Sequence, residues 1–132
     1  MFLLDTNACI AILKHSSLPL VERLHRHSAS EIRIPSVAKA ELLFGARRSL
    51  RVADNLRSLE RFWVPYVSLP FDDRCAEHYG IVRTGLVARG QTIGPNDFLI
   101  ASIALAHDLT LVTHNLGEFS RVPGLHLEDW EG

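Results

Sequence analysis

The chain alternates short apolar runs with longer segments of helical periodicity. The runs at 2–4, 32–34, 64–69 and 109–113 are typical of strands, although Pro65 weakens the third, and 125–127 could add an edge strand. Between them, apolar residues recur every three or four positions and predict helices at 10–14, 19–24, 36–44, 47–62, 72–89 and 97–107. This alternation favours an α/β fold, with a mostly parallel sheet covered by helices.

Two of the predicted helices have unusual patterns. The segment 97–107 is apolar on nearly every side, so we expect its helix in the core. In the helix that begins near Ser36, Glu41 lies on the same apolar stripe as Val37 and Phe44. A carboxylate on such a stripe needs a cation, a hydrogen-bond donor or water.

Polar residues stand where a parallel sheet presents its ligands, at the carboxyl ends of the strands. Asp5 follows the first apolar run, Asn115 follows the run at 109–113, and Asp97 lies in the first turn of the apolar helix. Each has an ordinary structural interpretation as a helix cap, a turn residue or a charge that complements a helix dipole. Glu41 could likewise reach solvent from the edge of its stripe.

Three carboxylates gathered at one sheet edge would repel one another unless a cation lay between them. Oxygen ligands suit a hard divalent ion such as Mg²⁺, which can activate water and stabilise charge on a phosphodiester. The seven His form no HxxxH or HxH pair near these acids, so zinc is disfavoured. The pattern therefore permits a metal-dependent phosphodiesterase formed by Asp5, Glu41 and Asp97.

Composition adds one feature to this picture. The chain of 132 residues carries a net charge of −1 and is 47% hydrophobic, as expected of an ordinary globular domain. Arg supplies 12 of the 14 basic residues, and Arg47, Arg48 and Arg51 belong to a cluster that extends to Arg61. Arg suits bidentate phosphate contacts, so these three are candidates for contacts with nucleic acid, although a solvated helix face would look the same.

Other features bound the cellular setting. Two cysteines without a CxxC pair are too few for a disulfide scaffold or a zinc ribbon. No apolar run approaches the roughly 20 residues of a membrane span. The N-terminus reaches Asp5 without a basic region, unlike a signal peptide. We therefore expect a cytoplasmic protein with no membrane partner.

Four segments resemble one known family when taken in order. They are MFLLDTN at 1–7, AELLFGAR at 40–47, IGPNDFLIA at 93–101 and TLVTHNLGEF at 110–119, continued by RVPGL at 121–125 and by Asp129-Trp130. The chain resembles the PIN-domain ribonucleases, and among them the VapC toxins of type II toxin–antitoxin systems. Because the resemblance spans nearly the whole chain, we expect a single PIN-like domain over residues 1–132.

The resemblance implies a three-layer α/β/α fold and cleavage of RNA that depends on Mg²⁺, with Mn²⁺ as a substitute. It also implies a VapB-type antitoxin that blocks the site, a homodimer, and a structured RNA substrate such as a tRNA. The acidic residues of the family fall on Asp5, Glu41 and Asp97, and Asn115 occupies the position of a fourth acid. The alternative is a PIN fold that lacks catalysis and only binds RNA or protein.

Some details of the site stay open at this stage. Asn115 weakens the case for a second tightly held metal, and Glu118 could substitute for the missing acid. By resemblance, Thr6 and Thr113 lie near enough to orient a ligand or a water.

Overall fold

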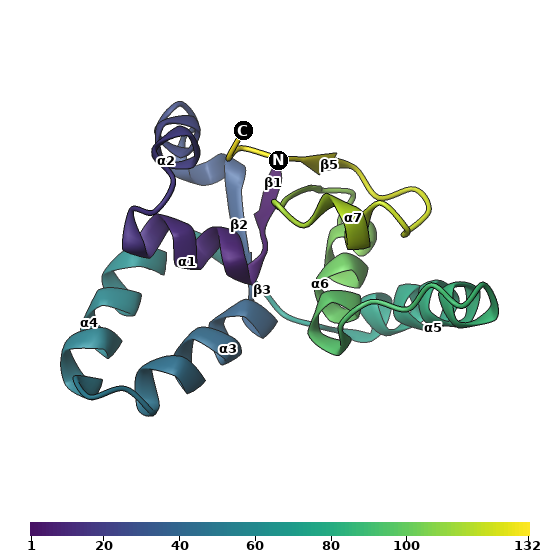
Figure 1. Cartoon of the computed structure of the whole chain (residues 1–132), viewed down its shortest axis with the longest axis horizontal. Coiled ribbons are helices and arrows are strands. Elements are labelled where there is room, and N and C mark those ends of the chain that lie inside the picture. Colours follow the sequence, from purple (N-terminus) through teal and green to yellow (C-terminus); the bar gives the residue numbers. More distant parts are fainter.

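A computed structural model describes all residues from 1 to 132 (Figure 1). Its strands are β1 (Phe2–Leu4), β2 (Ile32–Pro35), β3 (Val67–Leu69), β4 (Thr110–Val112) and β5 (Leu127–Glu128). Its helices are α1 (Thr6–Lys14), α2 (Leu18–His25), α3 (Ser36–Arg47), α4 (Val52–Trp63), α5 (Asp73–Ala88), α6 (Pro95–Ala106) and α7 (Leu116–Phe119), with a 3₁₀ turn at Ala29–Glu31.

The five strands form one sheet in the order β3-β2-β1-β4-β5, and all four pairings are parallel. The central strand β1 aligns Leu3 with Arg33 of β2 on one side and with Leu111 of β4 on the other. The α/β prediction is confirmed. Parallel pairing requires a crossover between neighbouring strands, and the predicted helices supply it.

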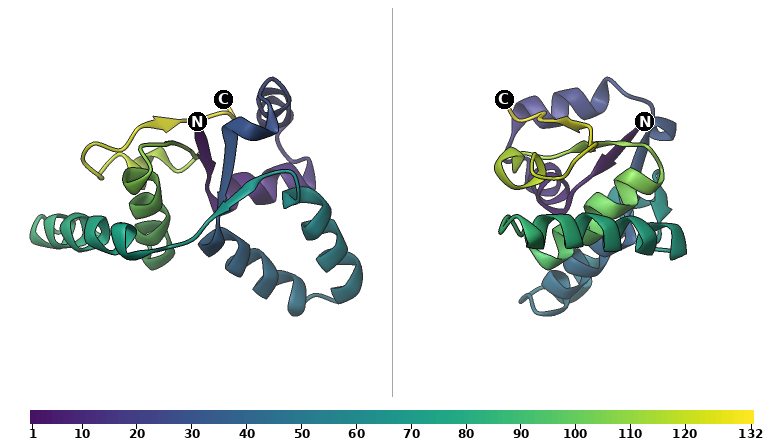
Figure 2. Two further views of the ribbon diagram at one scale, coloured as in Figure 1. Left: turned by 180° about the vertical axis from the view of Figure 1, so that it is seen from behind. Right: turned by 90° about the vertical axis from the view of Figure 1, so that its right-hand side faces the viewer.

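Side chains of the central strands alternate between two cores, one on each face of the sheet. Leu4 and Val112 join a core with α1 to α4, whereas Leu3 and Leu111 join a core with α5, α6 and Phe119 of α7. Helices accordingly lie on both sides of the sheet (Figures 1 and 2). The three-layer α/β/α architecture is confirmed, and no helix combines the length and apolar character needed to cross a bilayer.

The helix α6 lies in the core as expected, with seven buried residues along its length. It begins at Pro95, two residues before the predicted start, because proline is well tolerated in a first helical turn. The short helix α7 was not predicted, and the last strand covers Leu127–Glu128 instead of 125–127.

The prediction of one helix over 47–62 is wrong. α3 ends at Arg47, a turn follows, and α4 begins at Val52. The hydroxyl of Ser49 donates to the carbonyl of Ala46 at 2.6 Å, which satisfies a carbonyl at the end of α3. Leu50 lies in this turn and is fully exposed, so it belongs to no apolar helix face.

The apolar stripe expected on α3 is also placed differently. The buried residues of α3 are Ala38, Leu42 and Ala46. Phe44, expected to share an inward stripe with Glu41, leaves 64% of its surface exposed. Small alanines let α3 approach the core that contains Leu4 and Val112 closely. The face that carries Glu41 and Phe44 is then turned away from this core.

Candidate functional site

A polar pocket of about 270 Å³ lies at the carboxyl ends of β1 and β4. Segments from four parts of the chain meet there: the first turns of α1 and α6, the middle of α3, and the residue before α7. No Lys, Arg or His lines it, and its lining residues are Asp5, Thr6, Asn7, Glu41, Gly94, Pro95, Asn96, Asp97 and Asn115.

Asp5 sits at the junction of β1 and α1 and leaves only 3% of its surface exposed. It caps α1, because its Oδ1 accepts the backbone N–H of Ala8 at 2.8 Å. Burial raises the pKa of Asp5, while hydrogen bonds from Thr113 and from the Ala8 N–H lower it in part. Asp5 is therefore a helix cap and also a pocket carboxylate.

Glu41 enters the pocket from the middle of α3, where it is half-buried. The hydroxyl of Thr6 donates to Glu41 Oε1 at 2.7 Å. A carboxylate among apolar residues needs a cation, a hydrogen-bond donor or water, and Glu41 has such a donor in Thr6. That donor comes from the first residue of α1, which directly follows Asp5.

Asp97 lies in the first turn of α6, after Gly94 and Pro95. Burial first, and then the negative charges of Glu118, Asp5 and Glu41, raise the pKa of Asp97 to about 6. A Cβ on Gly94 would lie 3.1 Å from Asp97 Oδ2, so a larger residue at position 94 would push this oxygen aside slightly.

Asn115 lines the pocket on the side of β4, and Glu118 and Thr113 form hydrogen bonds with it. The Asn115 side-chain amide donates to Glu118 Oε2, and the Asn115 backbone N–H donates to the Thr113 hydroxyl at 2.9 Å. Glu118 also acts on Asp97, because its negative charge raises the pKa of that carboxyl. The sequence alone left open whether Glu118 takes part in the site. Its position three residues after Asn115, at the start of a helix, indicates that the two side chains lie on the same face.

The candidate arginines lie outside the pocket. Arg47 ends α3, while Arg48 and Arg51 flank the turn that leads into α4. All three are exposed and none lines the pocket. They occupy the outer end of α3, which runs away from the edge of the sheet (Figure 1).

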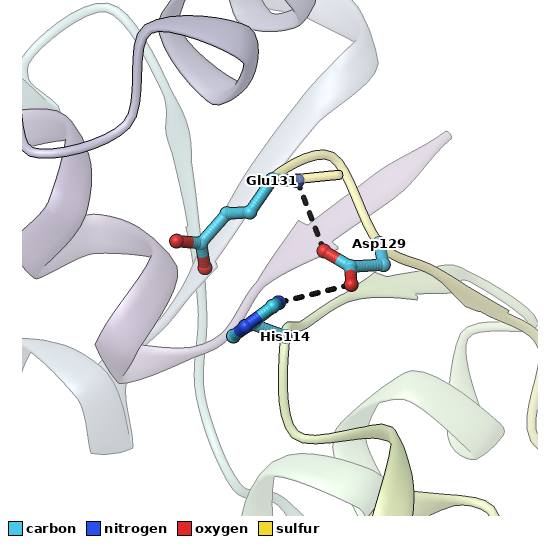
Figure 3. A group of neighbouring side chains, drawn as sticks. All are labelled: His114, Asp129 and Glu131. Atoms are coloured by element: carbon cyan, nitrogen blue, oxygen red, sulfur yellow. Dashed lines mark hydrogen bonds and ion pairs between the residues drawn. The ribbon is translucent and has the colours of Figure 1, made fainter.

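A second group of possible ligands lies on the β4 and β5 side. His114, Asp129 and Glu131 each bring one ligand atom within 4.8 Å of the others (Figure 3). His114 Nδ1 lies 2.9 Å from Asp129 Oδ2, and this hydrogen bond raises the pKa of His114. This group therefore contains an imidazole beside its two acids, whereas no Lys, Arg or His lines the pocket.

The pocket fits a hard divalent cation. Its side chains offer carboxylate, hydroxyl and amide oxygens, the ligand types that Mg²⁺ and Mn²⁺ prefer. Burial is the main cause that raises the pKa values of Asp5 and Asp97, and neighbouring carboxylates add to it, so a bound cation would stabilise their charged forms. The ligand atoms of the three acids do not all lie within 4.8 Å of one another, as those of the His114 group do, so an ion held in the pocket would be bound in part through water.

Comparison with known proteins agrees with this geometry. A family model described as the PIN domain matches residues 2–125. The chain belongs to the PIN-domain family. This PIN domain is 39% identical over 129 residues to the tRNA(fMet)-specific endonuclease VapC of Salmonella typhimurium, covering 98% of this chain and 97% of the relative. It is 40% identical over 134 residues to ribonuclease VapC2 of Rickettsia felis, covering 99% and 98%.

Solved structures give the same result for the fold. The PIN domain matches a chain of VapBC2 from Rickettsia felis, crystallised on a promoter DNA fragment, with a TM-score of 0.92, 36% identity and 98% coverage of both chains. A chain of DNA-bound VapBC from Salmonella typhimurium also gives a TM-score of 0.92, with 39% identity and coverage of 98% and 97%. The predicted resemblance to VapC ribonucleases is confirmed.

Proposed function

We propose that this PIN domain is the toxin of a type II toxin–antitoxin pair, an endoribonuclease that depends on Mg²⁺ held by Asp5, Glu41 and Asp97. One observation carries the proposal: these carboxylates come from three separate elements to one pocket with no cationic side chain. A domain that only bound RNA or protein would gain nothing from gathering uncompensated acids, because Asp5 and Glu41 both raise the pKa of Asp97.

The residues of the pocket would have different roles in the reaction. Asp5 and Asp97 would hold the ion directly or through water, with Asn115 as a weaker ligand. Once bound, Mg²⁺ would stabilise charge on the phosphate and lower the pKa of a nearby water, and Mn²⁺ is expected to substitute for it. We assign to Glu41 the orientation or deprotonation of the attacking water, because Thr6 holds Oε1 at 2.7 Å and leaves Oε2 available.

Glu118 is a positioning residue in this scheme. It accepts the side-chain amide of Asn115, and its negative charge raises the pKa of Asp97. Thr113 donates to Asp5 and accepts the backbone N–H of Asn115. These hydrogen bonds orient Asp5 and Asn115 on the β4 side of the pocket.

RNA is the substrate expected from the relatives, and we propose a structured RNA such as a tRNA. The VapC relatives from Salmonella typhimurium and Shigella flexneri are named as tRNA(fMet)-specific endonucleases. Exposed loops of a folded RNA present unpaired bases and bent backbone to a nuclease. Arg47, Arg48 and Arg51 would contact the phosphates of such a loop, because guanidinium groups bind phosphate well.

An antitoxin of the VapB type is the expected protein partner, since the similar solved structures are VapBC complexes. An apolar groove of about 520 Å³ lies between α1, α3 and α4, and Glu41 lines both this groove and the acidic pocket. We propose that an apolar antitoxin segment fills the groove and thereby covers the pocket. A homodimer stays a prediction, for which exposed Ile81 and Val87 on α5 offer apolar surface.

The first experiment is cleavage of total cellular RNA by purified, antitoxin-free protein. It is run with Mg²⁺, with EDTA, and with the Asp5→Asn and Asp108→Asn variants, the second being an exposed control. Discrete cuts that need the metal and Asp5 but tolerate Asp108→Asn would establish the nuclease and map its target. No cutting by a folded protein that binds Mg²⁺ would favour a binding-only domain. Cutting that survives EDTA would come from a contaminant.

A further inference from the structure

Phe44 is a large aromatic side chain that is mostly exposed. It leaves 64% of its surface in solvent, although α3 buries Ala38, Leu42 and Ala46 against the core. It also lines neither the apolar groove nor the acidic pocket. An exposed ring of this size beside a functional site indicates a binding surface.

The position of Phe44 relates it to the pocket. Glu41, Phe44 and Arg48 are spaced by three and four residues, so they follow one stripe along α3. Phe44 stands one helical turn beyond Glu41, about 4.5 Å further along the helix axis. Because α3 runs away from the edge of the sheet, the stripe leads from the pocket out into solvent (Figure 1).

A positive charge lies over this ring. The Arg48 guanidinium carbon lies 4.9 Å from the centroid of the Phe44 ring. Such a cation–π contact keeps a guanidinium at the ring while much of the ring stays accessible. Arg47 and Arg51, three and seven residues further along the chain, are also exposed. An aromatic face bordered by arginines is the arrangement that proteins use to bind unpaired nucleotides, with the base on the ring and the phosphates on the cations.

From this stripe we infer that Phe44 is a base-stacking platform for an unpaired RNA nucleotide next to the scissile phosphate, with Arg48 beside it. The inference rests on the proposed ribonuclease function and adds a substrate subsite to it. Every base presents a π-face, so Phe44 would contribute affinity and position the strand without reading its sequence. Arg48 would stack on the other face of the base or turn to its phosphate.

The test uses RNA oligonucleotides that contain the mapped cleavage site, each with 2-aminopurine at one position. The fluorescence of this base falls when it stacks. Binding is measured with Asp97→Asn, so that the RNA stays intact, alone and combined with Phe44→Ala, Phe44→Trp or Leu43→Ala. Leu43 is the matched control because it is an exposed apolar neighbour on the same helix.

We expect one position beside the cut to lose fluorescence on binding. Phe44→Ala should abolish that change and weaken binding about tenfold, while Phe44→Trp and Leu43→Ala retain both. In the protein with Asp97 intact, Phe44→Ala should raise KM about tenfold and change kcat by less than twofold. Replacing the stacked nucleotide with an abasic one should weaken RNA binding by wild type by the same factor of about ten. The same replacement should weaken binding by Phe44→Ala only slightly further.

Four results would overturn the inference. One is an equal loss of affinity in Phe44→Ala for intact and abasic RNA. Another is an unchanged fluorescence response accompanied by a change of oligomeric mass or of antitoxin affinity, which would make Phe44 a protein contact. Cleavage that needs Mg²⁺ and Asp5 but ignores Phe44 would reject the subsite and leave the ribonuclease standing, whereas absence of RNA cleavage would reject both.

Discussion

The hydroxyl of Thr6 donates a 2.7 Å hydrogen bond to Glu41 Oε1, which joins the first residue of α1 to the middle of α3. The two residues are far apart in the chain, yet this bond orients a carboxylate of the pocket. Thr6 also follows Asp5 directly, so the turn that holds Asp5 holds Glu41 as well. The N-terminus of α1 is therefore the element that brings two of the three acids together.

Replacing Thr6 by valine should lower cleavage about tenfold, because Glu41 loses the donor that orients it. Valine keeps the shape of threonine, so the unfolding temperature should stay close to that of wild type. Thr6→Ser retains the hydroxyl and should recover most of the activity. Full activity in Thr6→Val, measured as initial rate at saturating Mg²⁺, would remove this hydrogen bond from the mechanism.

Asp97→Asn should reduce cleavage by about a hundredfold or more while leaving the fold intact. It removes the charge of a proposed metal ligand in the pocket while keeping the size of the side chain. Circular dichroism would check folding, and isothermal titration with Mg²⁺ would check binding. Asp108→Asn, an exposed position with a positive φ of 51° that asparagine tolerates, is the control. Residual activity within a few-fold of wild type would exclude Asp97 as a ligand.

The metal-free protein should become less stable as pH rises through about 6. The folded state raises the pKa of Asp97 from 3.8 to about 6, so the unfolded chain releases this proton more readily than the folded protein does. The stability contributed by this group is therefore complete below about pH 4 and lost as pH passes 6. Thermal unfolding in EDTA should show this decline in wild type, and Asp97→Asn should show less of it.

Mg²⁺ should reverse that decline, because the ion binds the ionised carboxylates and only the folded state forms the pocket. At pH 7.5 we expect Mg²⁺ to raise the unfolding temperature of wild type and to leave that of Asp97→Asn nearly unchanged. An equal rise in both proteins would place the bound ion elsewhere, and the group of His114, Asp129 and Glu131 would be the next site to test.

Gly94→Ala should lower cleavage by about 10- to 100-fold at subsaturating Mg²⁺. The added Cβ would lie 3.1 Å from Asp97 Oδ2 and would displace that oxygen. Gly80→Ala is the matched control, because Gly80 lies within α5 and its Cβ would meet nothing within 4 Å. The control should be as active as wild type and more stable by about 0.5–1 kcal/mol. Equal activity of both variants would show that cleavage does not depend on the absence of a side chain at position 94.

Replacing Arg47, Arg48 and Arg51 together by alanine should weaken RNA binding and flatten its dependence on salt. Each lost phosphate contact should reduce the slope of log K against log salt by about 0.7 for single-stranded RNA. The control replaces Arg26, Arg89 and Arg121, which are exposed and lie outside that cluster, and so removes the same charge. If both triple variants show the same slope, the cluster is only a solvated surface.

The local sequence was sufficient for the parts of the site that depend on neighbouring residues. Asp5 ends a strand and caps the next helix, and Asp97 follows Gly94-Pro95 at a helix start, so both positions could be predicted from short motifs. Parallel strands then bring these ends to one edge of the sheet. The apolar character of α6 likewise predicted its burial, because a helix without a polar face has no side to present to water.

Only the tertiary structure decided the rest. Periodicity shows that Glu41 and Phe44 share a face of α3, but not that Ala38 and Leu42 turn the opposite face to the core, because that depends on how closely the partner elements pack. The bond from Thr6 to Glu41 and the effect of the Glu118 charge on Asp97 link residues distant in sequence. Spacing along a chain determines which side chains are neighbours within one element, and the packing of elements determines which of them meet.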